Sequence, residues 1–103
     1  MSWSLANVED RAKEHPETFL IPDRETRETL QPGDIAKLLF EMGVDTGGFL
    51  RGERMWVEIT AVLGPGRYEG KLANSPIAII ELARGDLLKF GAEHVANWEG
   101  SRP

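Results

Sequence analysis

The chain of 103 residues contains no cysteine, which excludes disulfide bonds, thiolate metal sites and cysteine nucleophiles. Histidine is scarce as well, because His15 and His94 are the only two, and neither has the spacing of zinc ligands. The first residues show neither the basic segment nor the apolar stretch of an export signal. We therefore predict a cytoplasmic protein that binds no metal and no cofactor.

Basic residues are also few in comparison with acidic ones. The 12 Lys and Arg residues are outnumbered by 17 Asp and Glu, which gives a net charge of -5. Such a chain repels phosphate backbones, and the composition, 41% hydrophobic and 28% charged, is that of an ordinary globular protein. We therefore expect neither nucleic acid nor a membrane as a partner, and one domain with one core.

What the sequence does contain is a short internal repeat. The segment 33–38 begins with Gly33-Asp34 and returns as 85–90, which begins with Gly85-Asp86. In both places a turn signal is followed by alternating apolar side chains. The repeat predicts two strands, each started by a turn that its aspartate caps, and this explains both carboxylates without catalysis.

The clearest alternation covers 53–63, where Met55, Val57 and Ile59 share one side of a predicted strand. Gly64-Pro65-Gly66 then turns the chain into a second strand over 67–73. Apolar residues face each other if the following pairs form: Leu63 with Tyr68, Ala61 with Gly70, and Ile59 with Leu72. We predict this register for the hairpin.

These patterns predict an α+β fold in which an N-terminal helix packs on a bent antiparallel sheet of five or six strands, similar to a small SH3-like barrel. The chain is one domain, 1–103, with the helix in 1–15, a β-rich body in 16–98 and a loose tail in 99–103. Further expected elements are a short helical turn capped by Asp23, a loop over 43–52, a strand over 77–80, a turn over 91–94 and a strand over 95–98. The predicted core is Ala36, Leu38, Phe40, Met55, Val57, Ile59, Ala61, Tyr68, Leu72, Ile79, Leu88 and Phe90.

Trp56 is the residue that core patterning does not explain. Alternation places it on the polar side of its strand between Arg54 and Glu58, and an aromatic residue among charges is typical of a protein-interaction hot spot. We predict these three residues as a protein-binding site. In the alternative interpretation the N-terminal helix covers Trp56 through Leu5 and Val8, because that helix also needs an apolar surface.

The segments 53–60 and 68–76, together with Gly85-Asp86 and His94-Val95, resemble the bacterial domain-of-unknown-function family 2314. The resemblance covers about residues 17 to 98, and the Met55-Trp56-Val57 strand is its most specific part. It implies a compact α+β domain without an established activity. Some relatives resemble immunity-type proteins that bind a partner toxin, and no catalytic residue is carried over.

Three functions follow from the sequence. The first is a non-enzymatic protein-binding module that uses Arg54, Trp56 and Glu58. The second is a small hydrolase or lyase in which His94 acts with a nearby carboxylate, either Glu93 or Glu58, and it requires a pocket that joins them. The third is a self-associating protein, for example a homodimer formed through an edge strand or through the Trp56 side of the sheet.

Overall fold

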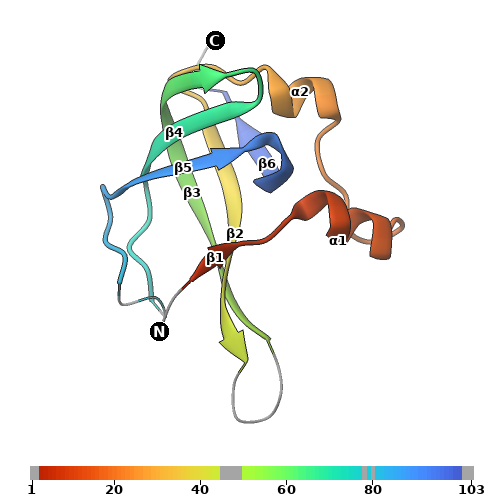
Figure 1. Cartoon of the computed structure of the whole chain (residues 1–103). Helices are drawn as coiled ribbons and strands as arrows, with labels where there is room; N and C mark the ends of the chain where they lie inside the picture. Colours follow the sequence, from red (N-terminus) through yellow and green to blue (C-terminus); the bar gives the residue numbers. More distant parts are fainter. Residues whose placement is uncertain (1–2, 45–49, 78, 80, 101–103) are drawn as a thin grey trace.

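The computed structural model describes residues 3–44, 50–77, 79 and 81–100. It is a small α+β structure whose antiparallel sheet curls into a half-barrel, with both short helices on one side of it (Figure 1). The elements are β1 Ser4–Leu5, α1 Val8–Glu14, α2 Arg24–Glu28, β2 Ile35–Val44, β3 Leu50–Gly64, β4 Arg67–Leu72, β5 Leu87–Gly91, the 3-10 helix η1 Ala92–His94 and β6 Val95–Glu99.

Strands β2, β3, β4 and β5 follow one another in the sheet, each antiparallel to the next. The other edge of β2 is shared, because β6 pairs with its first half and β1 with Phe40 and Glu41. β3 pairs with β2 over Leu50–Glu58 and with β4 over Val57–Gly64, so Val57 and Glu58 have a strand partner on both sides.

The two Gly-Asp segments form the same structure twice. Gly33 and Gly85 have φ angles of 96° and 95°, which glycine adopts without the steric cost of a side chain. The Asp34 carboxylate accepts a hydrogen bond from the amide of Gln31, and Asp86 does the same with Ala83, each at 2.9 Å. The predicted aspartate-capped turns are therefore confirmed, and both start a strand.

The core fills the concave side of the sheet. All of the predicted core residues except Ala61 are buried there. Tyr68 shows how the polar atoms inside are satisfied: its hydroxyl donates to the main-chain oxygen of Arg27 at 2.7 Å and accepts from the amide of Leu30 at 3.1 Å. The tyrosine therefore ties the segment after α2 to the sheet, and burial raises its pKa above the ordinary value.

The predicted register of the β3–β4 hairpin is wrong, by one residue next to the turn, where Tyr68 pairs with Val62 rather than Leu63, and by two residues further along. Leu72 pairs with Val57 rather than Ile59, and Gly70 pairs with Ile59 rather than Ala61. Irregularities between Ile59 and Ala61, and again between Val62 and Gly64, account for the shift. A two-residue shift keeps side chains on their predicted side, so the core prediction survives up to Ile59, while the irregular end near the turn leaves Ala61 half-buried and Leu63 exposed.

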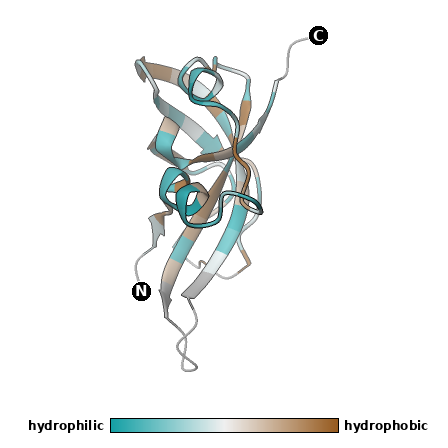
Figure 2. Cartoon of the chain, turned by 90° about the vertical axis from the view of Figure 1, so that its right-hand side faces the viewer, coloured by the Kyte–Doolittle hydropathy of each residue, from teal (hydrophilic) through white to brown (hydrophobic). Residues whose placement is uncertain are grey.

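The N-terminal region also differs from the prediction. The helix predicted in 1–15 covers only Val8–Glu14, because Ser4 and Leu5 pair with β2 as β1. Asn7 caps α1 by accepting from the amide of Asp10, and α1 ends at Glu14, ahead of Pro16, as expected. Both helices are mainly hydrophilic (Figure 2), and Val8 is the buried residue that α1 contributes.

The remaining boundaries need smaller corrections. Asp23 caps α2 through the amide of Thr26, as predicted. The loop predicted over 43–52 is shorter, because β2 continues to Val44 and β3 begins at Leu50, and 45–49 lie outside the described residues. Ile77 and Ile79 lie in no strand, and positions 78 and 80 are likewise not described. The turn predicted over 91–94 contains η1, and β6 includes Glu99, which the prediction assigned to the tail.

Candidate functional site

The three predicted binding residues lie together on the outward side of β3. Arg54, Trp56 and Glu58 alternate there with the buried residues Met55 and Val57. On the neighbouring strand, Leu39 pairs with Arg54, Lys37 with Trp56 and Ile35 with Glu58. We call Lys37, Arg54, Trp56 and Glu58 the Trp56 face.

Trp56 is half-buried and belongs to neither hydrophobic cluster of the protein. The Lys37 ammonium lies 5.1 Å from the centre of its ring, a distance at which a cation attracts the aromatic π-system. The Trp56 amide donates to the side-chain oxygen of Asn74 at 2.6 Å, and its carbonyl accepts from the amide of Ala73 at 2.8 Å. The ring therefore stands on a fixed main chain.

The alternative interpretation, in which the N-terminal helix covers Trp56, is wrong. Val8 packs with Ala6 and Leu39 instead, and Leu5 packs against the main core. The cluster around Leu39 also receives Phe19, Ile21 and Ala96. The N-terminal segments thus cover the sheet at Leu39 and stop short of Trp56.

A hollow of about 210 Å³ lies where this cover ends, beside the Trp56 face. Lys37 and Arg54 line it with Leu39, Asn97 and the segment Thr18–Leu20. Leu20 is 77% exposed. Neither cation forms an ion pair with a carboxylate of the residues that the structure describes, so both charges are available to a ligand.

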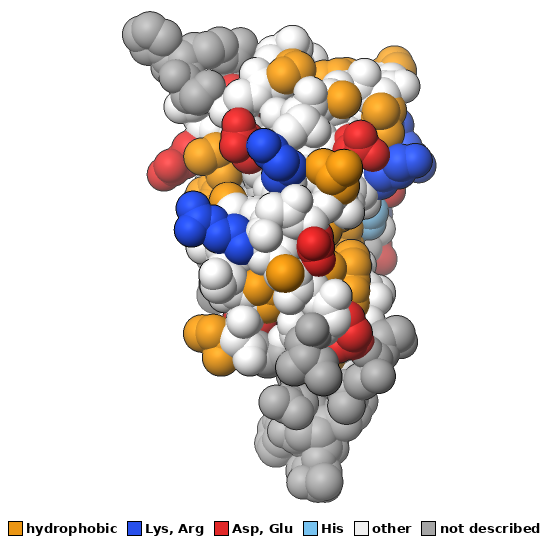
Figure 3. All heavy atoms as spheres, turned by 90° about the vertical axis from the view of Figure 1, so that its left-hand side faces the viewer, with side chains coloured by type: hydrophobic (Ala, Val, Ile, Leu, Met, Phe, Trp, Pro, Cys, Tyr) orange, Lys and Arg blue, Asp and Glu red, His pale blue; other side chains and the backbone are white. Residues whose placement is uncertain are grey.

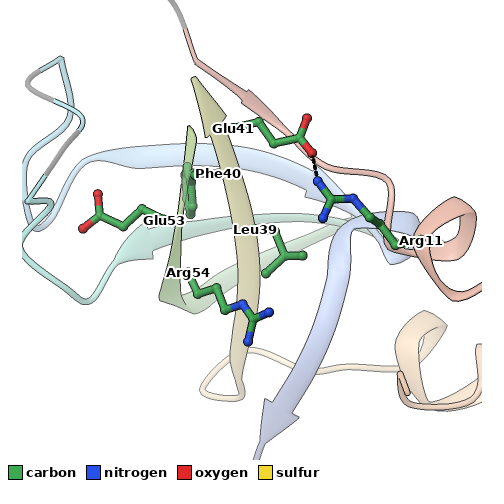
Figure 4. A pocket seen from close by; sticks show the side chains of 7 residues that line it. Arg11, Leu39, Phe40, Glu41, Glu53 and Arg54 are labelled. Carbon is green, nitrogen blue, oxygen red and sulfur yellow. Dashed lines mark hydrogen bonds and ion pairs between the residues drawn. The ribbon is translucent and has the colours of Figure 1, made fainter. Parts of the chain in front are cut away.

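A second hollow, of about 260 Å³, lies on the other side of Leu39 and Arg54. Here Arg11 forms an ion pair with Glu41, and the Arg54 guanidinium points away from that pair (Figure 4). The positive charge of Arg11 is therefore already engaged. Arg54 lines both hollows and is the cation between them without a carboxylate partner.

The remaining ion pairs hold the N-terminal segments in place. The Arg27 guanidinium, of which only 7% of the side chain is exposed, donates to Glu9 at 2.7 Å, to the carbonyl of Ala92 at 2.9 Å and to that of Pro22 at 2.8 Å. Its hydrogen bond is the main reason why the pKa of Glu9 lies below the ordinary value. Arg27 thus joins α1, α2 and η1.

His94 is not part of the Trp56 face and lines a separate hollow of about 410 Å³, together with Glu93 but without Glu58. Its Nδ1 accepts a hydrogen bond from the amide of Gly91 at 3.0 Å. In the neutral imidazole the proton is therefore on Nε2. Burial is the main reason why the pKa of His94 is lowered. The side chain offers a hydrogen-bond donor to the hollow while its lone pair is engaged inside the protein.

Sequence reasoning missed several residues of this region. Alternation along β2 puts Lys37 on the outer side of its strand, but only the strand pairing brings it opposite Trp56. Leu20 and Asn97 reach the same hollow from distant parts of the chain. A signal for Lys37 was present, since it is the one charged residue in the apolar run 35–40, whereas nothing local in the sequence marks the other two.

No protein-family model, curated protein or solved structure matches this chain. Among the described residues, no group of His, Asp and Glu side chains is arranged to hold a metal ion. In the same residues, no helix has the length and apolar character needed to cross a membrane.

Proposed function

We propose that this protein is a non-enzymatic protein-binding module and that the Trp56 face receives a segment of the partner protein. The observation that carries the proposal is the position of Trp56, which stands in the middle of two long paired strands and yet lies outside both hydrophobic clusters. A large aromatic residue on a rigid sheet loses little conformational freedom when it is covered.

The composition of the face supports the same function. Interaction hot spots are enriched in Trp and Arg and are surrounded by residues that exclude water. Trp56 and Arg54 are adjacent on one side of β3, and the half-open hollow beside them accepts a side chain of the partner. Glu58 pairs across the sheet with Lys71 and forms the polar rim at the far end.

The strand order supports an SH3-like barrel as the finer description of the fold. The order β6, β2, β3, β4, β5, with the 3-10 helix η1 leading into β6, is that of a five-stranded small barrel to which β1 and the two helices are added. In such barrels an open sheet side or strand edge is a common place for partner recognition. We expect the protein to act in the cytoplasm.

A hydrolase or lyase centred on His94 is less well supported. A general base must present a lone pair to the substrate, and the lone pair of neutral His94 accepts the amide hydrogen of Gly91 instead. Glu93 shares the hollow, but no serine, threonine or cysteine lines it among the described residues. Tyr68 and Lys89 line it too, but the Tyr68 hydroxyl is hydrogen-bonded to the main chain of Arg27 and Leu30. No ion pair within the described part of the chain joins Lys89 to a base that would activate it as a nucleophile.

Self-association is the alternative function, and it would use the exposed edge of β5. β5 pairs with β4 alone among the described strands and leaves its other edge unpaired, and Leu87 is 64% exposed there. On the side of the molecule shown in Figure 3, however, apolar side chains lie scattered among basic and acidic ones. Sedimentation equilibrium separates the two functions, because the proposed module is a monomer whose mass does not rise with concentration.

The proposal is tested by affinity capture followed by reconstitution. The wild type, Trp56→Ala and the control Leu87→Ala, which removes another exposed apolar side chain, are used as baits in an extract of the native host. We expect the wild type and Leu87→Ala to retain a protein that Trp56→Ala loses, and the purified pair to bind with the same dependence. A purified partner that binds Trp56→Ala as tightly as the wild type would contradict the proposal.

A further inference from the structure

We propose that the segment bound by the Trp56 face is acidic and that one of its carboxylates lies in the hollow between Lys37 and Arg54. This inference rests on the proposed function and names the chemistry of the partner. It is argued from the charges around the hollow, the exposed apolar side chains beside it and the position of Glu58.

The charge around the hollow is opposite in sign to the net charge of the protein. The chain carries a net charge of -5, yet the described residues that line this hollow include Lys37 and Arg54 and no Asp or Glu. The other main-chain and side-chain groups there are apolar or neutral, among them Thr18 and Asn97. A local positive site on a negative protein favours an acidic ligand and determines where on the surface that ligand binds.

These two cations differ from the other basic residues near the helices. Arg11, Arg24 and Arg27 each form an ion pair with a glutamate of this protein. Lys37 interacts with the Trp56 ring, and Arg54 forms no ion pair with any of the described residues. A carboxylate that binds between Lys37 and Arg54 supplies the missing counter-charge, and the planar guanidinium receives it through two parallel hydrogen bonds.

Apolar contacts next to the hollow specify a second feature of the segment. Leu20 is 77% exposed at the rim, and Trp56 stands on the other side of Lys37. A segment that places an acidic residue in the hollow therefore has an apolar side chain close to it in sequence. Glu58 sets the direction, because it repels acidic residues from the far end of the face.

A nucleic acid fits this surface less well than a polypeptide. A phosphate backbone requires a continuous basic track, and the row beyond Trp56 interrupts it, because it contains Lys71 but also Glu58 and, across Ile35 on β6, Glu99. The positive region thus spans one hollow rather than a groove. Binding of single-stranded DNA to Lys37 and Arg54 is an outcome that would overturn the inference.

The test is a selection of random 12-residue peptides displayed on phage against four purified proteins. These are the wild type, Trp56→Ala, the reversal Lys37→Glu with Arg54→Glu, and a control reversal, Arg84→Glu with Lys89→Glu, which makes the same change of net charge elsewhere on the surface. Far-ultraviolet circular dichroism confirms that each is folded. A single-stranded DNA of 12 nucleotides is titrated in parallel.

Some of the selected peptides should bind the wild type and the control reversal but not Trp56→Ala. We expect these peptides to be enriched in Asp and Glu next to an apolar residue. The Lys37→Glu and Arg54→Glu protein should lose that enrichment. For one such peptide, Arg54→Gln alone should weaken binding by about two- to fivefold, since the side chain is exposed and screened by solvent, and the loss should shrink at high salt.

The outcomes separate the two claims. Trp56-dependent peptides without acidic enrichment, or with the same enrichment after the reversal at Lys37 and Arg54, would refute the acidic partner and leave the binding module standing. If none of the selected peptides depends on Trp56, both proposals fail. Stronger binding of the DNA than of the peptides, with loss on the same reversal, would replace the acidic segment by a phosphate backbone.

Discussion

The outward side of β2 and β3 is covered at one end and open at the other. At Leu39, which is 7% exposed, the N-terminal segments pack against the sheet through Val8, Ala6 and Phe19. At Trp56, two residue pairs further along the sheet, Lys37 is the side chain found over the ring. The basic residues differ in the same way, because Arg11 and Arg27 are paired with glutamates while Arg54 is not.

This difference shows that the N-terminal segments cover the outward side of the sheet around Leu39 and leave the part around Trp56 uncovered. By packing on Leu39, the N-terminal segments bury their own apolar side chains. Trp56 then remains as a large aromatic surface with unpaired positive charge next to it, and we attribute its open position to binding. The predictions below test this contrast, from the largest expected effect to the smallest.

The first prediction concerns a core residue on the concave side of the sheet, where we expect the largest loss of stability. Ile59→Asp should abolish cooperative thermal unfolding, because a carboxyl group without a partner in the core costs several kcal/mol, a large part of the roughly 5–15 kcal/mol by which a domain is stable. Thr60→Asp, at the next and exposed position, should melt almost like the wild type. Circular dichroism measures both, and a sharp melting transition for Ile59→Asp would contradict the inward position of this residue.

The second prediction concerns the arginine that holds the covered end together. Arg27→Met should lower the free energy of unfolding by about 2–4 kcal/mol, since it removes three hydrogen bonds and the partner of Glu9. Arg24→Met, in the exposed pair with Glu28, should cost less than about 1 kcal/mol. Urea unfolding measures the two, and similar losses would show that the buried guanidinium has no special role.

The third prediction compares the two ends directly. Leu39→Ala should cost about 2–3 kcal/mol, because it leaves a cavity under the N-terminal segments, whereas Trp56→Ala should cost about 1 kcal/mol, mostly from the lost contact with Lys37 and lower strand propensity. Urea unfolding of the two variants checks the order. A larger loss at position 56 would mean that Trp56 is a packing residue.

The fourth prediction is a pH dependence. The pKa of His94 is lowered from 6.5 mainly by burial, so in the window below pH 6.5 the unfolded chain takes up a proton that the folded chain refuses. The free energy of unfolding should therefore fall as the pH drops through this window. Below 4.5 it should fall further, because the pKa of Glu9 is lowered mainly by its hydrogen bond with Arg27.

The control for this pH dependence is His94→Gln, which removes the titrating group and keeps an acceptor for the amide of Gly91. Its unfolding free energy, measured in urea at several pH values, should be flatter between pH 6.5 and 5. An unchanged slope in this variant would assign the acid sensitivity to other groups.

Much of the fold was predictable from the sequence because its signals are local. Alternation assigns Met55, Val57 and Ile59 to the core whatever the register, and the aspartates of both Gly-Asp turns cap residues only three positions away. The register of the hairpin was not predictable, because shifts by two residues give the same inward and outward sets. The two irregularities in β3 have no distinctive residue that marks them.

The site was predictable in part for the same reason. Arg54, Trp56 and Glu58 follow from the alternation of a single strand. Their neighbours depend on contacts across the fold: Lys37 comes from strand pairing, and Leu20 from a segment without helix or strand. That the N-terminal segments cover Leu39 rather than Trp56 depends on β1, two residues long, which has no pattern of its own.

The most direct test of the account is the affinity of one peptide from the selection for the wild type and for Trp56→Ala, measured by isothermal titration calorimetry on proteins shown to be folded. An aromatic hot spot is worth about 2 kcal/mol or more, so the variant should bind at least about 30-fold more weakly. Equal affinities would contradict the claim that the open end of the sheet exists to bind a partner.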